Sequence, residues 1–452
     1  MKHLYFSFIV LLSSCYSFSQ IGINTTTPNA TLEIKASNQS TPSNNDGILI
    51  PKIDAFPTIN PSASQHSMLV YLTTASGSYV PGFYYWDYNA LQWKTIGNDT
   101  DWGLLGNSGT NSSYNFMGTI DNNDVVFRRN NLFSGTIATS NTAFGNQAFF
   151  SRYGTNNVAI GTESLYNGNS NETTAVGAFS LHDNGNAQQN TGVGYQSMRY
   201  NYSGNFNTAT GYQSLLALAS GDGNTALGCS ALEAGSHIAY NTAIGYKALL
   251  MNQGSQNTAV GYNAGSQAAN GANNTAIGYM SQWGLNSGFN NVTLGSETLL
   301  NCSNGNGLTA IGTAALRENN GAGNTALGFE TLRTNFDGNN NTAAGYHALY
   351  GQMSGNNNSA FGYGAMGASN HSSYNTAMGY NALFFNQGFS NTAIGHESMF
   401  NSNNSGGNTA VGYQSLFNAY GGGYNTAIGF FAIQMGGGNN TTAVLVAQLQ
   451  QI

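Results

Sequence analysis

A short motif that returns every 16 or 17 residues through most of the chain constrains its fold more than any other feature. The motif consists of Asn, Thr, Ala, an apolar residue and Gly, and Asn241–Gly245 is a representative copy. A fixed period of this length predicts a solenoid, in which each repeat forms one coil that stacks on its neighbours. The eighteen motif glycines stand at positions 145, 161, 177, 194, 211, 228, 245, 261, 278, 295, 312, 328, 345, 362, 379, 395, 412 and 429.

Each position of the motif accepts few residue types. The position four before the glycine is Asn in 16 of the 18 copies, with Thr173 and Leu308 as the exceptions. A second apolar position lies four residues after the glycine, as at Leu249, and only Gly265 and Gln282 interrupt it. Two apolar positions per repeat are too few for paired helices, and frequent Gly and Asn disfavour helix. The pattern predicts two short strands per coil, joined by turns.

The predicted fold is therefore all-β, a β-solenoid or β-roll of about 18 coils over residues 141–433 and roughly 85 Å long. Alternation along the first strand places Thr and the apolar residue on one face, with Asn, Ala and Gly on the other. We expect the face of Thr and the apolar residue, including Ile244, to point inward. We expect the Asn side chains to form a hydrogen-bonded ladder. The Gly suits either a positive φ or a close approach of coils.

The ends of the chain carry different signals. Residues 1–19 resemble a signal peptide because Lys2 and His3 precede a short apolar run, so we expect an exported protein of Gram-negative type, either secreted or displayed on the outer cell surface. Leu12–Cys15 also resembles a lipoprotein box, which would place the protein on a membrane through a lipid at Cys15. We favour simple secretion. Residues 434–452 are interpreted as a truncated or degenerate end of the solenoid.

The segment before the repeats divides into a β-rich cap region at 20–100 and a connecting β segment at 101–140. Strands are expected in the cap at Ile21–Ile34, as a strand, a turn and a second strand, and at Gly47–Pro51 and Met68–Leu72. Phe83–Lys94 predicts a β-hairpin with aromatic flanks.

These pieces resemble known families. Ile21–Pro28, Tyr85–Asp87 and Asn115–Asn122 look like parts of secreted bacterial tail-fibre-domain proteins, and the Asn-Thr-Ala-Ile-Gly repeats are similar to the left-handed β-roll heads of trimeric autotransporter adhesins. The resemblance covers nearly the whole mature chain and implies a homotrimeric surface fibre with an adhesive role. We expect the C-terminal chaperone or membrane anchor of those families to be absent, since only a short segment up to Ile452 follows the repeats.

No chemistry typical of an enzyme stands out. A glycosidase needs two carboxyl groups about 5 to 9.5 Å apart in a cleft. Glu297 and Glu330, which lie two coils apart in the same column of the repeat, are the only pair at about this separation. The histidines, including His347 and His396, do not cluster at metal-ligand spacings. We therefore expect no enzyme activity, no cofactor and no metal.

The composition limits the classes of molecule that the chain can bind. Only 6% of the residues are charged and the net charge is −7, so the chain offers no basic patch for a phosphate backbone and nucleic acid is excluded as a partner. Aromatic residues often follow the motif glycine, and Tyr246, Tyr262 and Tyr279 are the candidate ligand-binding residues, because stacked rings can bind sugars. The competing interpretation is that these rings only cover the edge of the solenoid and pack on one another.

Four functions remain open after these exclusions. The leading hypothesis is a secreted or cell-surface fibrous protein that is structural and adhesive, forms a homotrimer and binds a glycan or another cell-surface ligand. The alternative is a tail-spike-like protein that binds or depolymerises carbohydrate. An ice-binding protein would use the Thr column, and a functional amyloid would suit the Asn-rich repeats.

Overall fold

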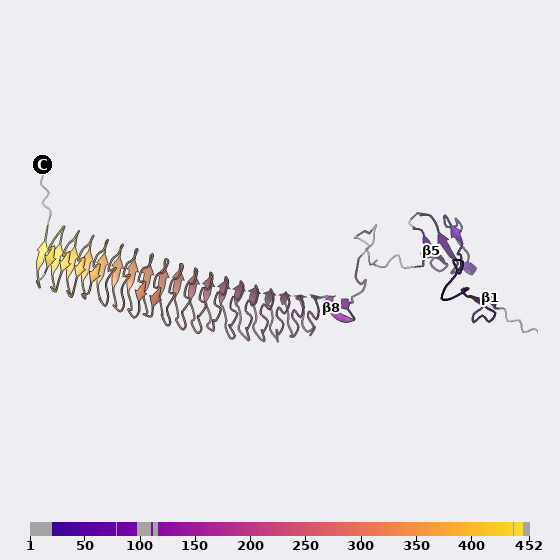
Figure 1. Cartoon of the computed structure of the whole chain (residues 1–452), viewed down its shortest axis with the longest axis horizontal. Coiled ribbons are helices and arrows are strands. Elements are labelled where there is room, and N and C mark those ends of the chain that lie inside the picture. Colours follow the sequence, from indigo (N-terminus) through magenta and orange to yellow (C-terminus); the bar gives the residue numbers. More distant parts are fainter. Residues whose placement is uncertain (1–19, 78, 97–109, 112–115, 437, 446–452) are drawn as a thin grey trace, which may run out of the picture. The chain divides into compact units, whose positions relative to one another are not determined.

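The fold is described from a computed structural model that covers residues 20–77, 79–96, 110–111, 116–436 and 438–445. The expected signal peptide, including Cys15, lies outside these residues. The chain divides into two units, Met1–Met117 and Gly118–Ile452 (Figure 1). Within the described residues no helix is long and apolar enough to cross a membrane. The described structure is almost entirely β, as the sequence predicts.

The N-terminal unit begins with a two-stranded parallel sheet. Strand β1 (Ile21–Ile23) pairs in parallel with β2 (Leu32–Ile34), so the expected strand, turn and strand are present. The strand expected at Gly47–Pro51 is absent, which corrects that prediction. Ile48 and Leu49 there are 65% and 84% exposed, so the described residues do not cover these side chains.

A four-stranded sheet forms the rest of this unit. It contains β3 (Lys52–Ile53), β4 (Leu69–Leu72), β5 (Gly82–Asp87) and β6 (Gln92–Thr95), and a 3-10 turn, η1 (Ala63–Gln65), precedes β4. The predicted hairpin is confirmed, because β5 and β6 are antiparallel and Trp86 lies opposite Trp93. Tyr84, Trp86 and Leu72 are buried, and Phe56 stacks on Trp93 with ring centroids 4.9 Å apart. Large side chains thus fill one compact core.

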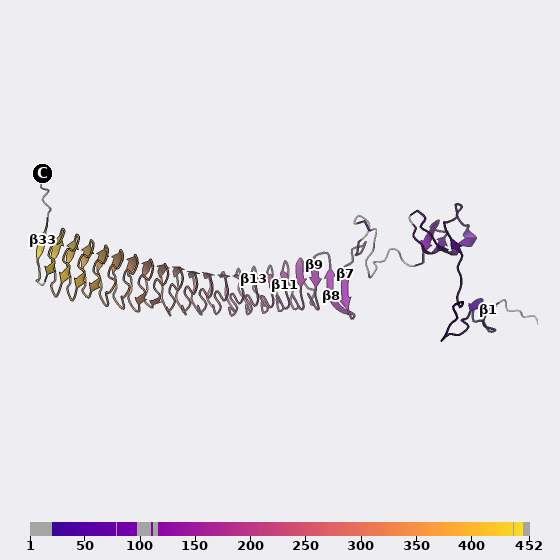
Figure 2. The same ribbon diagram turned by 45° about the horizontal axis from the view of Figure 1, so that its top comes forward.

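The second unit is a rod of stacked coils (Figures 1 and 2). It begins with an antiparallel hairpin of β7 (Val125–Arg129) and β8 (Leu132–Ile137), and β8 is antiparallel to the first motif strand, β9 (Asn141–Phe144). From β9 onward each motif strand pairs in parallel with the equivalent strand of the next coil, as Ile244 pairs with Val260. The chain therefore advances by one strand spacing per repeat, about 4.8 Å.

The parallel ladder continues through one strand for every repeat. Its members after β9 are β10 (Asn157–Ile160), β11 (Thr174–Val176), β12 (Thr191–Val193), β13 (Thr208–Thr210), β14 (Thr225–Leu227), β15 (Thr242–Ile244), β16 (Thr258–Val260), β17 (Thr275–Ile277), β18 (Val292–Leu294), β19 (Thr309–Ile311), β21 (Thr325–Leu327), β23 (Thr342–Ala344), β24 (Ser359–Phe361), β25 (Thr376–Met378), β27 (Thr392–Ile394), β29 (Thr409–Val411), β31 (Thr426–Ile428) and β33 (Thr442–Val444). Because β33 pairs with β31, the ladder extends beyond the last motif glycine into the segment interpreted as degenerate.

The second apolar position does not form the second strand that the sequence predicts for every coil. Leu249 lies in a turn and has a φ of 50°, in the left-handed region, and the equivalent residues share this conformation. The short strands outside the main ladder are β20 (Glu318–Asn319), β22 (Thr334–Asn335), β26 (Phe385–Asn386), β28 (Asn401–Ser402), β30 (Asn418–Ala419) and β32 (Met435–Gly436). The turn nevertheless directs the Leu249 side chain into the coil, where it is 2% exposed.

The expected direction of the strand faces is wrong. Ala243 has no exposed surface, whereas Ile244 is 36% exposed. The interior of the coil is filled by the motif alanines and by the residues four after each glycine, such as Leu249. A small side chain is needed on the strand because a large one reaches it from the opposite turn. Thr and the apolar residue of the motif consequently face outward.

The Asn ladder is present, and backbone hydrogen bonds accompany the expected side-chain bonds. Nδ2 of Asn241 donates to Oδ1 of Asn224 in the preceding coil at 3.1 Å. The side-chain Oδ1 of Asn241 accepts the backbone N–H of Asn257 in the next coil at 2.9 Å. Its Nδ2 donates to the carbonyl of Gly254, across the interior of the coil, at 3.1 Å. Equivalent backbone-to-Oδ1 bonds of 2.8–3.1 Å run from Asn141 to Thr173, from Asn190 to Leu308 and from Asn324 to Thr441. The breaks follow the two positions that are not Asn.

The motif glycine is required for both of the reasons that the sequence suggests. Gly245 has a φ of 132°, which side chains of L-residues rarely adopt. A Cβ atom added there would lie 2.5 Å from the carbonyl oxygen of Gly261 in the next coil. Every coil therefore turns and contacts its neighbour at the same backbone position.

Candidate functional site

The outward face of the strand ladder is the largest regular surface of the rod. It carries the Thr and apolar columns of the motif, and none of their positions from β9 to β33 holds a charged residue. Thirteen apolar residues of this face are exposed, and they are Phe144, Ile160, Leu227, Ile244, Ile277, Val292, Leu294, Leu327, Phe361, Met378, Ile394, Ile428 and Val444. Exposed apolar strips of this kind are typical of surfaces that contact another molecule.

The candidate ligand-binding residues Tyr246, Tyr262 and Tyr279 lie side by side on consecutive coils. Their ring centroids are 5.3 and 5.4 Å apart and the rings are nearly parallel. All three side chains are between 41% and 49% exposed. Because each ring covers the face of the next, the hydroxyl groups and ring edges make up most of what a ligand would contact.

Lys247 modifies one end of this row. Its ammonium group lies 5.1 Å from the centroid of the Tyr246 ring. Its contact with the Tyr246 hydroxyl is the main cause that raises the pKa of Lys247 above its ordinary value. The Tyr246 end of the row is therefore positively charged.

A longer aromatic row lies further along the rod. It contains seven rings on successive coils, with centroid distances of 4.9–5.3 Å, and its members are Phe329, Tyr346, Tyr363, Tyr380, His396, Tyr413 and Phe430. We call this row the aromatic ladder. Sequence reasoning identified the column but did not single out this stretch, because His396 interrupts the Tyr and Phe pattern in the sequence and continues it in the structure.

A parallel set of rings lies four positions later in the same coils. Phe384, Phe400 and Phe417 stack with centroid distances of 5.5 and 5.3 Å. Near the start of the rod, Tyr166 and His182 stack in the equivalent way with a centroid distance of 5.0 Å. Ring stacking between coils is thus a recurrent means of covering the edges of the rod.

The two carboxylates considered for glycosidase chemistry are each engaged in ion pairs. Glu297 accepts a hydrogen bond from Nε of Arg317 at 3.1 Å. Glu330 lies 3.3 Å from Nε of Arg333 and 2.9 Å from Nε2 of His347. Within the described residues, no group of three His, Cys, Asp or Glu side chains could hold a metal ion. These charges are accounted for by surface pairing.

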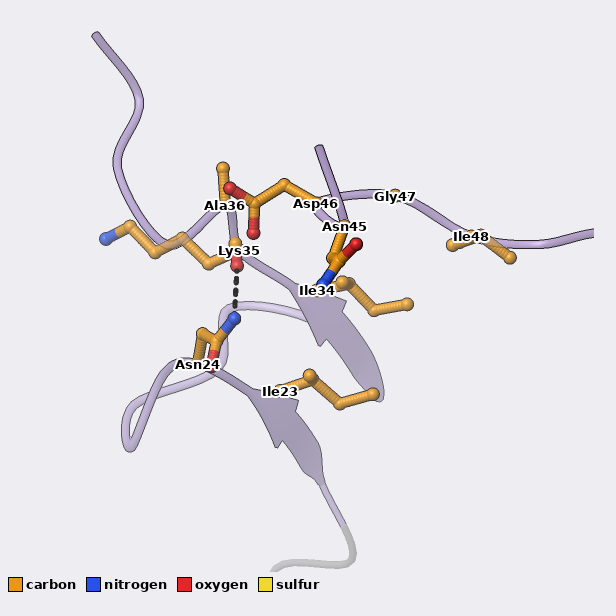
Figure 3. Close-up of a pocket in the computed structure, with 9 residues that line it drawn as sticks. All are labelled: Ile23, Asn24, Ile34, Lys35, Ala36, Asn45, Asp46, Gly47 and Ile48. Carbon is orange, nitrogen blue, oxygen red and sulfur yellow. Dashed lines mark hydrogen bonds between the residues drawn. The ribbon is translucent and has the colours of Figure 1, made fainter. Parts of the chain in front are cut away.

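The N-terminal unit has a shallow pocket of about 300 Å³ between β1, β2 and the segment at 45–48 (Figure 3). Ile23 and Ile34 extend to the same side of the two strands, and Asn24 donates a hydrogen bond to the Lys35 carbonyl at 3.2 Å. The hydroxyl of Ser37 is the main cause that lowers the pKa of the Asp46 carboxyl at the rim. The lining of this pocket combines the isoleucines with the polar residues Asn24, Lys35 and Asp46.

Comparison with known proteins concerns this same part of the chain. Residues 22–113 match the sequence model of the phage tail like trimerisation region. No curated protein and no solved structure was found to match the chain. The match and the β-solenoid together fit a tail-fibre-like protein with β-roll repeats. They suggest a trimeric fibrous structural protein.

Proposed function

We propose that the chain is a secreted or cell-surface fibrous protein that works as a homotrimeric rod with structural and adhesive roles and no enzymatic activity. The observation that carries the proposal is the outward strand face, which is apolar, uncharged and continuous from β9 to β33. A monomer would leave this whole face in water. A second and a third copy would cover it with an identical surface.

Shape and charge both favour further copies of this chain as the partner. A coil of the rod repeats its backbone at a constant spacing, so two rods packed side by side keep the same contacts along their length. No like charges would oppose one another, because the Thr and apolar columns contain none. Burying a half-exposed Ile or Leu contributes about 1 kcal/mol at 25 cal/mol per Å², and the contribution repeats on every coil.

The N-terminal unit supports the same assembly. It matches a trimerisation region, and Ile21, Leu49 and Ile59 are exposed large apolar residues within or beside the match. Association of three copies there would align three rods from a common start. This arrangement would favour contact between their strand faces, because joining the chains raises the local concentration of each rod.

Adhesion follows from repetition. A rod of this kind presents the same weak, uncharged contacts many times, so its affinity for a surface should depend on how many coils are engaged. The aromatic rows, including Tyr246, Tyr262 and Tyr279, are the proposed ligand contacts. Export through the N-terminal segment would place the rod outside the cell, and a lipid at Cys15 is the alternative means of attachment.

The adhesive role is tested with the full chain and with variants that lack pairs of coils. Binding to a panel of cells and immobilised glycans should fall steeply as pairs are removed from 242–341, and should change little between low and high salt. Fractionation of the producing cells should place the protein in the medium or on the outer surface. Retention in the cytoplasm, or an intact rod that binds no surface of the panel, would contradict the proposal.

A further inference from the structure

We propose that the aromatic ladder from Phe329 to Phe430 is a binding track for an extended, uncharged, β-1,4-linked polysaccharide that lies along the rod. This inference rests on the proposed adhesive function and specifies its ligand. It assigns the main ligand contacts to the longer row instead of to Tyr246, Tyr262 and Tyr279. The argument has three parts, which are the spacing of the rings, the unpartnered hydroxyl groups and the lack of charge.

The spacing of the ladder matches the repeat of such a polymer. Tyr346, Tyr363 and Tyr380 place their ring centroids 5.0 and 5.2 Å apart, and His396 follows at 4.9 Å. An extended β-1,4-linked chain advances by about the same length for each sugar unit. One sugar can therefore meet one coil without either partner changing its conformation, and the match extends over all seven rings.

The ladder presents hydrogen-bonding groups that the protein itself does not use. Within the described part of the chain, no hydrogen bond involves the hydroxyl groups of Tyr346, Tyr363, Tyr380 or Tyr413, and these side chains are between 39% and 49% exposed. A phenol hydroxyl both donates and accepts, as sugar hydroxyls do. The row thus offers one such group on three successive coils and another after His396.

Stacking also restricts how a sugar is held. The rings are within 17° of parallel to their neighbours, so each internal ring has both faces covered. A ligand meets the outer edge of the stack and its hydroxyl groups. This geometry favours a long polymer over a single sugar, because each contact is weak and the sum over several coils supplies the affinity.

The charged residues near the ladder indicate which chemical class of polysaccharide it can bind. No Lys or Arg follows Arg333 in the sequence, and Asp337 and Glu397 are the acidic residues beyond it. Arg333, near the start of the ladder, is paired with Glu330, and the ladder beyond it has no Lys or Arg to pair with the carboxylates or sulfates of an anionic polysaccharide. Neutral polymers such as cellulose and chitin have the extended linkage and carry no charge.

The test uses the full chain and two solid probes, microcrystalline cellulose and chitin, with starch granules as a neutral glucan of different linkage. The ladder variant carries Tyr346→Phe, Tyr363→Phe, Tyr380→Phe and Tyr413→Phe, which keep the rings and remove the hydroxyl groups. The matched control variant carries Tyr195→Phe, Tyr202→Phe, Tyr212→Phe and Tyr240→Phe, which remove exposed hydroxyl groups outside the ladder and outside the row of Tyr246, Tyr262 and Tyr279. Light scattering and thermal unfolding verify that both variants assemble and fold as the unaltered chain does.

The unaltered chain should bind cellulose or chitin more tightly than starch, with little dependence on salt. Each hydroxyl removed from the ladder should weaken binding about two- to tenfold, so the ladder variant should lose at least about tenfold. The control variant should stay within about twofold of the unaltered chain. Equal losses in the two variants, or no binding of the unaltered chain to either β-1,4-linked probe, would overturn the proposal.

The outcome is separable from that of the proposed function. A trimer that adheres to cells but binds neither cellulose nor chitin overturns the track and leaves the adhesive rod in place. A monomer that binds these probes through the ladder supports the track and contradicts the trimeric rod.

Discussion

The four-stranded sheet of the N-terminal unit and the rod bury their apolar side chains in opposite ways. The sheet gathers different large side chains, among them Trp86, Tyr84 and Leu72, into one core inside a single chain. The rod buries small or repeated side chains, such as Ala243 and Leu249, and leaves Ile244 outside. The sheet is held by contacts that occur once, and the rod by contacts that recur on every coil.

This difference indicates which of the two regions depends on a partner to cover its apolar side chains. The core of the sheet is closed by Phe56, which packs against Tyr84 and Trp93 with ring centroids 5.1 and 4.9 Å apart. The described residues of the rod provide no such cover for its own strand face. Substitutions should therefore act locally and strongly in the sheet, coil by coil inside the rod, and on assembly at the strand face of the rod.

The largest effect is expected in the sheet. Trp86→Ala should reduce the free energy of unfolding of the N-terminal unit by about 3–5 kcal/mol, because it leaves a cavity in the only cluster of large buried side chains described there. Unfolding followed by Trp fluorescence and near-ultraviolet circular dichroism measures this loss. The rod should keep its β signal, and a simultaneous loss of rod structure would show that the two regions do not behave independently.

A backbone substitution inside the rod should be nearly as costly. Gly245→Ala should destabilise its coil by about 3 kcal/mol or more, because the φ of 132° is unfavourable and the new Cβ would meet the carbonyl oxygen of Gly261. Hydrogen exchange should increase on the neighbouring coils and not at the far end of the rod.

Gly421→Asn is the matched control. Gly421 has a φ of 66° and no heavy atom within 4 Å of an added Cβ, and Asn tolerates the left-handed region. This variant should change the hydrogen-exchange rates of the coils next to Gly421 only slightly. Equal effects of the two substitutions would contradict the role assigned to the motif glycine.

The Asn ladder should contribute less for each residue. Asn241→Ala should cost about 2 kcal/mol, because it leaves the buried backbone N–H of Asn257 without its side-chain acceptor. The carbonyl of Gly254 loses one donor and keeps the hydrogen bond from Nδ2 of Asn252. Local hydrogen exchange of Asn257 is the readout. The control Thr242→Val should be close to neutral, since Val occupies the equivalent position at 158 and 292, and a cost equal to that of Asn241→Ala would mean that the ladder is not specific.

The smallest effect is a pH dependence of the N-terminal unit. Hydrogen bonds from Ser37 and Ser43 lower the pKa of Asp46 in the folded state. A carboxyl with a lowered folded pKa contributes stability above its unfolded pKa of about 3.9, and loses that contribution as the pH falls through the folded value. Titration followed by NMR should show the lowered pKa of Asp46, and Ser37→Ala should raise it toward the ordinary value. An unchanged pKa in this variant would contradict the assigned cause.

The sequence predicted the period, the parallel stacking and the Asn ladder because each depends on identity at a fixed position of the repeat. It did not predict which strand face points inward. Alternation separates Ala243 from Ile244 but does not say which of them meets Leu249 across the coil, and hydrophobicity alone favours the wrong one. The deciding factor is the space inside a coil, where a large residue from the turn requires a small one on the strand.

Other features could not be predicted from the sequence for related reasons. The turn at Leu249 places an apolar side chain inside the coil without a strand, so apolar periodicity alone mistook it for one. The segment Gly47–Pro51 has β-favouring residues, but within the described structure only Pro51, at its end, bonds to a neighbouring strand, through the N–H of Tyr71. The aromatic ladder depends on His396 acting as a ring among tyrosines, which is visible only once the coils are stacked.

The most direct test of the account is the mass of the purified chain in solution, measured by light scattering for the unaltered protein and for a variant with Ile244→Asp, Ile277→Asp and Ile394→Asp. The account predicts three copies for the unaltered chain. In the variant, buried charges on the strand face should dissociate the rods or sharply lower the stability of the trimer, while circular dichroism retains the β signal of the coils. An unaltered chain that is monomeric, or a variant trimer as stable as the original, would contradict the claim that the outward strand face joins the copies.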